Sequence, residues 1–251
     1  MNNIIKFYRI YKRKILIIIF TTVFVLGFFC NIPTMVLGSL VYKYSIHKLK
    51  LYNTHGTFWN GTGLLVAMGS ANSSAPLIRL NWNVKLGIKK FIDVTFYVDK
   101  INKNSTIANI YLNKDGVSID NLKLYLSLNQ VSELYNIVKN LNLSGNATIS
   151  GDKIILGSHN AGNIQLQLSN LSSGLSPVNP LGSYNVEYNI SNGNINILTP
   201  NPSIMNLTGK GTVDNLLLNA KIDPSKKDKL LQFIAVMGMP QPDGSYTLKI
   251  F

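Results

Sequence analysis

From about Lys48 to the C-terminus, the sequence consists largely of short segments in which apolar and polar residues alternate. In the segment 77–87, every second residue from Ile78 to Val84 is a large apolar one. The same period of two recurs at 92–99 and 163–169. This period places the apolar side chains of a strand on one face, which a sheet can then bury. The chain is therefore predicted to be mainly β, with a long, curved antiparallel β-sheet domain as its main part.

Turn-forming residues separate these segments. Hairpin turns are predicted at 114–116, 191–194 and 243–244, because Asn, Asp and Gly favour the backbone angles of tight turns. The segment 172–183 is rich in Pro, Gly and Ser and is the best candidate for an internal connector. We nevertheless expect one sheet to run across this connector, within a single domain at 48–251.

Two segments break the alternation and predict short helices. Residues 130–140 carry apolar side chains at helical intervals, and Asn129 is the candidate N-cap. Residues 224–238 form the second candidate, with Pro224 in the first turn and Gly238 at the C-terminal end. Each has an apolar stripe, so we expect both helices to cover an end or an edge of the sheet.

The N-terminus predicts a membrane anchor. Residues 15–32 carry no charge, and 18 residues rise about 27 Å as a helix, close to the hydrocarbon thickness of a bilayer. Residues 35–40 add apolar length. The preceding segment 1–14 contains five basic residues, Lys6, Arg9, Lys12, Arg13 and Lys14. By the positive-inside tendency, 1–14 lies in the cytoplasm, 15–40 is a transmembrane signal anchor, and the remainder is exported.

A cleaved signal peptide is the alternative interpretation of this segment. Its apolar region is normally shorter and is followed by small residues at the cleavage site. Here Phe28 and Phe29 place bulky side chains in that position, and Phe29 also argues against a lipoprotein site at Cys30. Cys30 is the single cysteine, so no intrachain disulfide forms.

The formal net charge of +13 does not indicate a nucleic-acid-binding protein. Five basic residues lie in the first fourteen positions, and the others form no dense run. Lys226, Lys227 and Lys229 are the tightest cluster, and two aspartates flank it. A nucleic-acid-binding protein needs a continuous basic face, so the sequence predicts a solvated, mildly basic surface instead.

The exported part shows no pattern typical of a catalytic or metal site. His55 and His159 are far apart in the sequence and have no second ligand at a zinc-type spacing. The Gly-x-Ser-x-Gly motif is absent, and several aspartates stand beside glycine, as is typical of turns. We therefore predict a protein that is not an enzyme and has neither a cofactor nor a metal.

The stretch HGTFWNGTG, residues 55–63, combines glycines with two large aromatics. It lacks the Gly-Lys-Ser/Thr ending of a phosphate-binding loop, and an extended run follows it instead of a helix. We interpret it as a strand that bends at its glycines, with Phe58 and Trp59 on opposite faces. A buried Trp59 ring predicts a loss of roughly 3 kcal/mol on replacement by alanine.

Three groups of small and aromatic residues follow one another along the chain. The first is Gly56, Thr57, Phe58, Trp59, Gly61 and Trp82, the second is Leu181, Gly182, Ser183 and Tyr184, and the third is Gly209, Gly211, Leu230, Leu231, Gly238, Asp243, Gly244 and Tyr246. Together with the basic N-terminus and its apolar segment, these groups resemble the type II secretion system protein N family. The region 101–150 shows no signature of that family.

The resemblance implies an inner-membrane protein with one spanning helix, a cytoplasmic N-terminus and a β-rich periplasmic domain. It also implies accessory work in exporting folded proteins across the outer membrane, with other type II secretion components as partners and no catalytic residues. The third group has a more distant likeness to AsmA-like envelope proteins, whose strands build an apolar trough for lipid.

Three hypotheses follow from these observations. In the first, the membrane-anchored sheet is an interaction module whose edges or ends contact other secretion components. In the second, the apolar face of the sheet is a groove that binds or transfers lipid. The third, an envelope hydrolase, requires a catalytic cluster that the sequence does not contain. The contacted component and the oligomeric state stay open.

Overall fold

The computed structural model describes residues 2–69, 73–88, 91–100, 103–114, 116–134 and 136–248. The helical elements are α1 (Asn2–Cys30), α2 (Thr34–Tyr44), α3 (Leu128–Val131), η2 (Ser132–Leu134), α4 (Asn136–Asn140), η3 (Pro224–Lys226) and α5 (Lys227–Met237). The strands are β1 (Leu49–Gly56), β2 (Asn60–Met68), β3 (Ser74–Leu86), β4 (Ile92–Lys100), β5 (Lys103–Asn113), β6 (Gly116–Ser127), β7 (Leu143–Gly157), β8 (Asn163–Ser173), β9 (Gly182–Asn189), β10 (Asn194–Leu198), β11 (Met205–Thr212), β12 (Asn215–Ile222), β13 (Gly238–Pro240) and β14 (Tyr246–Leu248).

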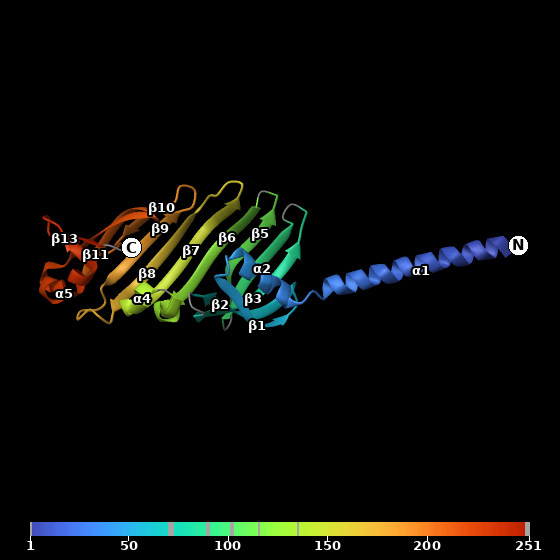
Figure 1. Ribbon diagram of the computed structural model, residues 1–251, viewed down its shortest axis with the longest axis horizontal. Coiled ribbons are helices and arrows are strands. Elements are labelled where there is room, and N and C mark those ends of the chain that lie inside the picture. Colours follow the sequence, from blue (N-terminus) through green and yellow to red (C-terminus); the bar gives the residue numbers. More distant parts are fainter. Residues whose placement is uncertain are drawn as a thin grey trace.

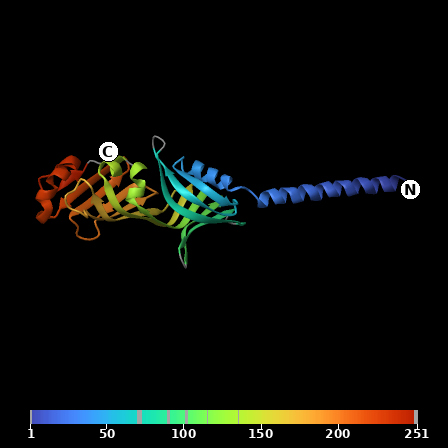
Figure 2. The ribbon, with the colours of Figure 1, turned by 90° about the horizontal axis from the view of Figure 1, so that it is seen from below.

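Across the described residues, the strands form one antiparallel sheet with β1 at one edge and β13 at the other. The order follows the sequence from β1 to β12, and then β14 lies between β12 and β13. The strands lie side by side along the length of the molecule (Figure 1), and the view from below shows that the sheet is curved (Figure 2). The predicted mainly β fold with one large antiparallel sheet is confirmed.

The predicted connector does not interrupt this sheet. β8 and β9, which flank it, pair with each other, and Leu168 lies opposite Tyr184. The predicted hairpin turns also occur: Asn113 pairs with Gly116, and the chain reverses between β9 and β10 and between β13 and β14. In the second of these turns, Gly193 has a φ of 71°, a conformation that glycine adopts without strain.

The two predicted helices are present, with one difference in each. The segment 130–140 is divided into α3, η2 and α4, and its N-cap is Ser127, not Asn129. Ser127 and Gln130 form a reciprocal capping box, which satisfies backbone donors at both positions. The second helix starts with Pro224 in the short turn η3 and ends at Gly238 as predicted, although Gly238 is extended and begins β13.

The apolar residues of the strands line one face of the sheet, here called the inner face, and α2, α3, α4 and α5 lie along it (Figure 2). One buried cluster lies under α2 and includes Trp82, and a second lies under α5. Leu122 and Leu124 of β6 pack against the first cluster, whereas Leu126, on the same face of the same strand, packs against the second. The apolar surface of the inner face is therefore continuous from one end of the sheet to the other.

The predicted segment 15–40 is divided between α1 and α2. α1 projects away from the sheet (Figure 1), and its large apolar side chains, such as Phe24 and Phe28, are exposed. α2 begins directly after Pro33 and packs against β1, where Leu37 is buried. In the parts of the chain with a described structure, no helix has both the length and the apolarity needed to cross a membrane. The anchor stays a prediction.

Candidate functional site

The stretch HGTFWNGTG contains the end of β1, the turn at 57–59 and the start of β2, so the predicted single bent strand is wrong. Gly56 has a φ of 97°, which lets the chain reverse. The amide of Thr57 donates to the carbonyl of Asn60 at 2.8 Å and closes the turn. The rings of Phe58 and Trp59 contact each other edge to face, with centroids 5.0 Å apart, instead of pointing to opposite faces.

This turn holds the C-terminal end of α1. The indole Nε1 of Trp59 donates to the carbonyl of Phe29 at 2.7 Å, and the two rings pack with centroids 4.7 Å apart. The amide of Phe58 donates to the carbonyl of Ile32 at 2.8 Å. Carbonyls in the last turn of a helix have no partner within the helix, so the hairpin satisfies one of them and fixes the neighbouring chain.

Trp82 of β3 explains why glycine occupies positions 61 and 63 in β2. Its side chain is fully buried, and its Nε1 donates to the carbonyl of Thr57 at 3.1 Å. The ring lies across β2 above Gly61 and Gly63, where an added Cβ would come within 2.5 Å and 3.3 Å of ring carbons. The structure thus brings together all six residues of the first predicted group at one hairpin, where the Trp82 ring meets Thr57 and Gly61.

The second predicted group lies at the other end of the sheet, where β9 meets β11. The hydroxyl of Tyr184 donates to the carbonyl of Met205 at 2.8 Å, and burial raises the pKa of Tyr184 above its ordinary value. Leu181 is buried and accepts a backbone hydrogen bond from Met205 at 2.9 Å. Gly182 leaves room for the Tyr184 hydroxyl, and the hydroxyl of Ser183 accepts from a backbone amide of β8.

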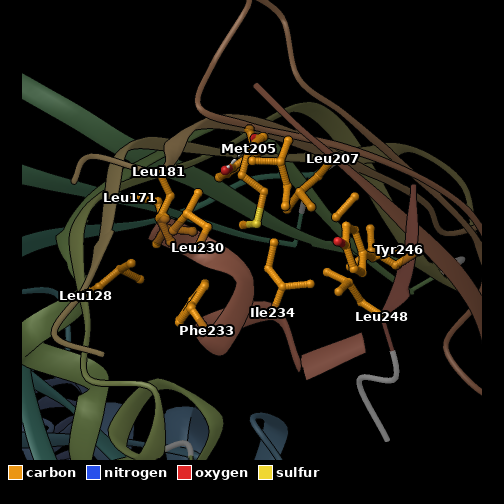
Figure 3. Close-up of a cluster of buried hydrophobic side chains, with 14 of the residues drawn as sticks. Leu128, Leu171, Leu181, Met205, Leu207, Leu230, Phe233, Ile234, Tyr246 and Leu248 are labelled. Atoms are coloured by element: carbon orange, nitrogen blue, oxygen red, sulfur yellow. Dashed lines mark hydrogen bonds between the residues drawn. The ribbon is translucent and has the colours of Figure 1, made fainter. Parts of the chain in front are cut away.

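The third predicted group supports the cluster under α5. Leu230 and Tyr246 are buried in it together with Leu248 (Figure 3). The glycines of this group lie in or beside the strands around the cluster. Gly209 faces Leu218, and Gly238 lies against Leu248. Gly211 closes the turn between β11 and β12, and Gly244 lies in the last turn. The carboxylate of Asp243 accepts from the hydroxyl and the amide of Ser245, which lowers the pKa of that carboxyl.

The second and third groups therefore share one core cluster, whereas the first belongs to the cluster under α2. The three groups form two structural supports at opposite ends of the sheet, and the predicted residues do not converge on one site. Leu231 belongs to the third group, but its side chain lies outside the described residues.

The described residues offer little for chemistry. They contain no group of three His, Cys, Asp or Glu side chains that could hold a metal ion. The pKa of Asp223 is lowered because its carboxylate accepts from Ser225 at the start of η3, which is a capping interaction. A hollow of about 220 Å³ lies in the sheet and is lined by Ser150, Gln165, Gln167, Asn185, Glu187 and Asn196, together with Leu166, Val186 and Leu198. Glu187 is the one carboxylate among these lining residues, and none of them is a histidine, lysine or arginine that could act with it as an acid–base pair.

Two features favour binding over chemistry. The edge strand β1 has exposed side chains at Lys50 and Tyr52, and no described strand lies beyond it. The inner face also carries a row of half-buried apolar residues across β6 to β10, of which Leu124 packs against the cluster under α2, and Leu166 and Ile197 pack against the cluster under α5. In the sequence, these residues are marked by the alternation of apolar and polar residues. This alternation identifies the apolar face of a strand but does not show how much of that face other elements cover.

The model of the family described as Type II secretion system (T2SS), protein N, matches residues 47–249. The matched range begins just before β1 and extends past β14, so it covers the whole sheet domain. No curated protein and no solved structure gives a significant match.

Proposed function

Because the chain belongs to the type II secretion system protein N family, we propose that it acts as an accessory inner-membrane component of type II secretion, without catalysis. The family predicted from the sequence is confirmed, and membership assigns the chain to type II secretion. The observation that carries the proposal is the extent of the match, which covers the sheet domain from its first strand to its last. The role in secretion therefore belongs to this domain.

The proposed membrane position follows from the N-terminus. Residues 15–32 carry no charge, and in α1 the side chains of Ile17, Phe20 and Phe28 are mostly exposed. Exposed apolar side chains along a helix are stable in lipid and costly in water. With the basic segment 1–14 in the cytoplasm, the sheet domain lies in the periplasm of a bacterial cell.

The proposed mode of action is contact through the edge strand β1. An edge strand presents unpaired backbone groups to which a partner strand can add, and other secretion components are the proposed partners. β1 follows α2 directly, so its edge lies at the membrane-proximal end of the domain, where inner-membrane components are within reach.

Deletion and cross-linking test this function together. In a strain that carries the other secretion components, deletion of the chain is expected to leave secreted enzymes in the periplasm, and the full chain is expected to restore their export. A photo-cross-linking residue at Tyr52 of β1 is expected to capture a secretion component. Tyr125, an exposed tyrosine near the end of β6, which is an interior strand of the sheet, is the matched control and is expected to capture none. Normal secretion after deletion, combined with equal capture from both positions, would refute the proposal.

A second function, binding of lipid along the inner face, is favoured by one observation. Five apolar residues form a row across adjacent strands in the middle of this face, namely Leu124, Ile149, Leu166, Val186 and Ile197. All five side chains are only partly buried. Mass spectrometry of the chain purified without added lipid tests this function, and we expect a co-purifying lipid that is reduced in Leu166→Gln. Chains that carry no lipid would exclude it.

A further inference from the structure

A cluster of exposed apolar side chains surrounds the point where α1 meets the sheet. Phe29, Cys30, Trp59 and Leu86 line an apolar hollow of about 360 Å³. Leu86 ends β3 and is 57% exposed, and beyond it Ile88 is 96% exposed. Phe91, which begins the return of the chain into β4, is 43% exposed. We call Phe29, Trp59, Leu86, Ile88 and Phe91 the junction surface.

The junction surface cannot move far from the end of α1. Only residues 31–33 separate α1 from α2, and three residues span at most about 10 Å. The connection is also fastened by the hydrogen bonds from Trp59 to Phe29 and from Phe58 to Ile32. Leu86 is held nearby, because the amide of Val84 donates to the carbonyl of Trp59 at 2.7 Å. Phe29, Trp59 and Leu86 therefore share the surroundings of the C-terminal end of α1, and Ile88 follows Leu86 by two residues.

The chemistry of the junction surface fits the boundary between lipid and water. Its apolar side chains continue the exposed apolar side chains of α1, where Phe28 precedes Phe29 of the junction surface and is 70% exposed. The indole N–H of Trp59 already has a partner, so its ring can enter a less polar environment without leaving a donor unsatisfied. Tryptophan is enriched at the membrane–water interface, which suits Trp59.

We propose that the junction surface rests in the headgroup region and the upper acyl region of the membrane from which α1 emerges. This inference rests on the proposed membrane anchor. It adds that the sheet domain does not swing freely on a tether, because the β1–β2 turn and the end of β3 are themselves in contact with lipid. The orientation of β1 relative to the membrane is then fixed by these contacts.

The test uses the full chain in nanodiscs and a fluorophore whose emission is quenched by lipids with a nitroxide near the headgroup. The background is Cys30→Ala, since Cys30 is the single cysteine. Three single-cysteine variants are labelled: Ile88→Cys on the junction surface, Val25→Cys within α1, and Leu217→Cys on β12. Leu217 is 65% exposed and lies toward the far end of the sheet, so it is the matched aqueous control.

We expect the label at position 88 to lose most of its fluorescence in nitroxide nanodiscs, and the label at 217 to lose almost none. If position 25 is quenched by nitroxides placed deep in the acyl chains while position 88 behaves like 217, the anchor holds and this inference is overturned. If position 25 also behaves like 217, the proposed anchor fails and the inference fails with it. Urea unfolding of the labelled variants establishes that each retains the fold.

Discussion

Replacing Gly61 with alanine tests whether the fold depends on the close approach of Trp82 to β2. The added Cβ would lie 2.5 Å from the carbonyl oxygen of His55 and 2.5 Å from the Cζ2 atom of Trp82. Neither neighbour can move easily. The carbonyl belongs to the paired strand β1, and the indole is fully buried and tied by its Nε1 to Thr57.

The loss of stability expected for Gly61→Ala is large because neither the His55 carbonyl nor the Trp82 ring can move away easily. Overpacking of a core by one methyl group costs about 1–3 kcal/mol when neighbours can shift. We expect the upper end, about 3 kcal/mol, because one clash is with backbone and the other with a ring fixed by packing and a hydrogen bond. A loss of this size changes the unfolding equilibrium constant by about a hundredfold.

Urea unfolding of the full chain in detergent, followed by tryptophan fluorescence, measures this loss. Gly38→Ala is the matched control, because Gly38 lies in the helix α2 at the same end of the domain and its added Cβ would be 3.9 Å from Leu51. In a helix interior, this change is expected to stabilise by up to about 1 kcal/mol. An unchanged urea midpoint for Gly61→Ala would refute the proposed packing of Trp82 over β2.

Three further outcomes are expected from unfolding experiments of the same kind. Tyr184→Phe is expected to cost about 1.5 kcal/mol, since it removes a buried hydrogen bond. Burial raises the pKa of Tyr184 above its ordinary value of 10.0, so the unfolded chain ionises first and stability falls as the pH rises above about 10; the fall should be smaller in Tyr184→Phe. Ser127→Ala is expected to cost about 1 kcal/mol through loss of the capping box, and an unchanged midpoint would contradict the N-cap assignment. Trp59→Ala is expected to lower the free energy of unfolding by about 2 kcal/mol, which is less than for a fully buried ring because the side chain is partly exposed. Trp59→Phe is expected to cost about half of that. Equal losses of stability in both variants would show that the hydrogen bond to Phe29 dominates.

The candidate sites show how far sequence reasoning reaches. Gly61 and Trp82 stand out in the sequence as members of one motif, and the structure shows why, since the ring of one occupies the space left by the other. Sequence reasoning did not place Phe29 beside Trp59, because no local pattern links residues thirty positions apart. The same limit applies to α2, whose apolar residues after Pro33 read as a continuation of the predicted anchor.

By itself, the sequence determined that the chain is mainly strand, where the turns at 114–116, 191–194 and 243–244 lie, and where the two later helices form. These features depend on short-range properties: the period of two, the backbone angles that Asn and Gly tolerate, and the preferences of helix ends. Tertiary structure alone decided that HGTFWNGTG contains a turn hydrogen-bonded to the end of α1, and that the row of apolar side chains across β6 to β10 is only half-buried. Both outcomes depend on contacts between segments that are distant in the sequence, and no residue's local preference specifies such contacts.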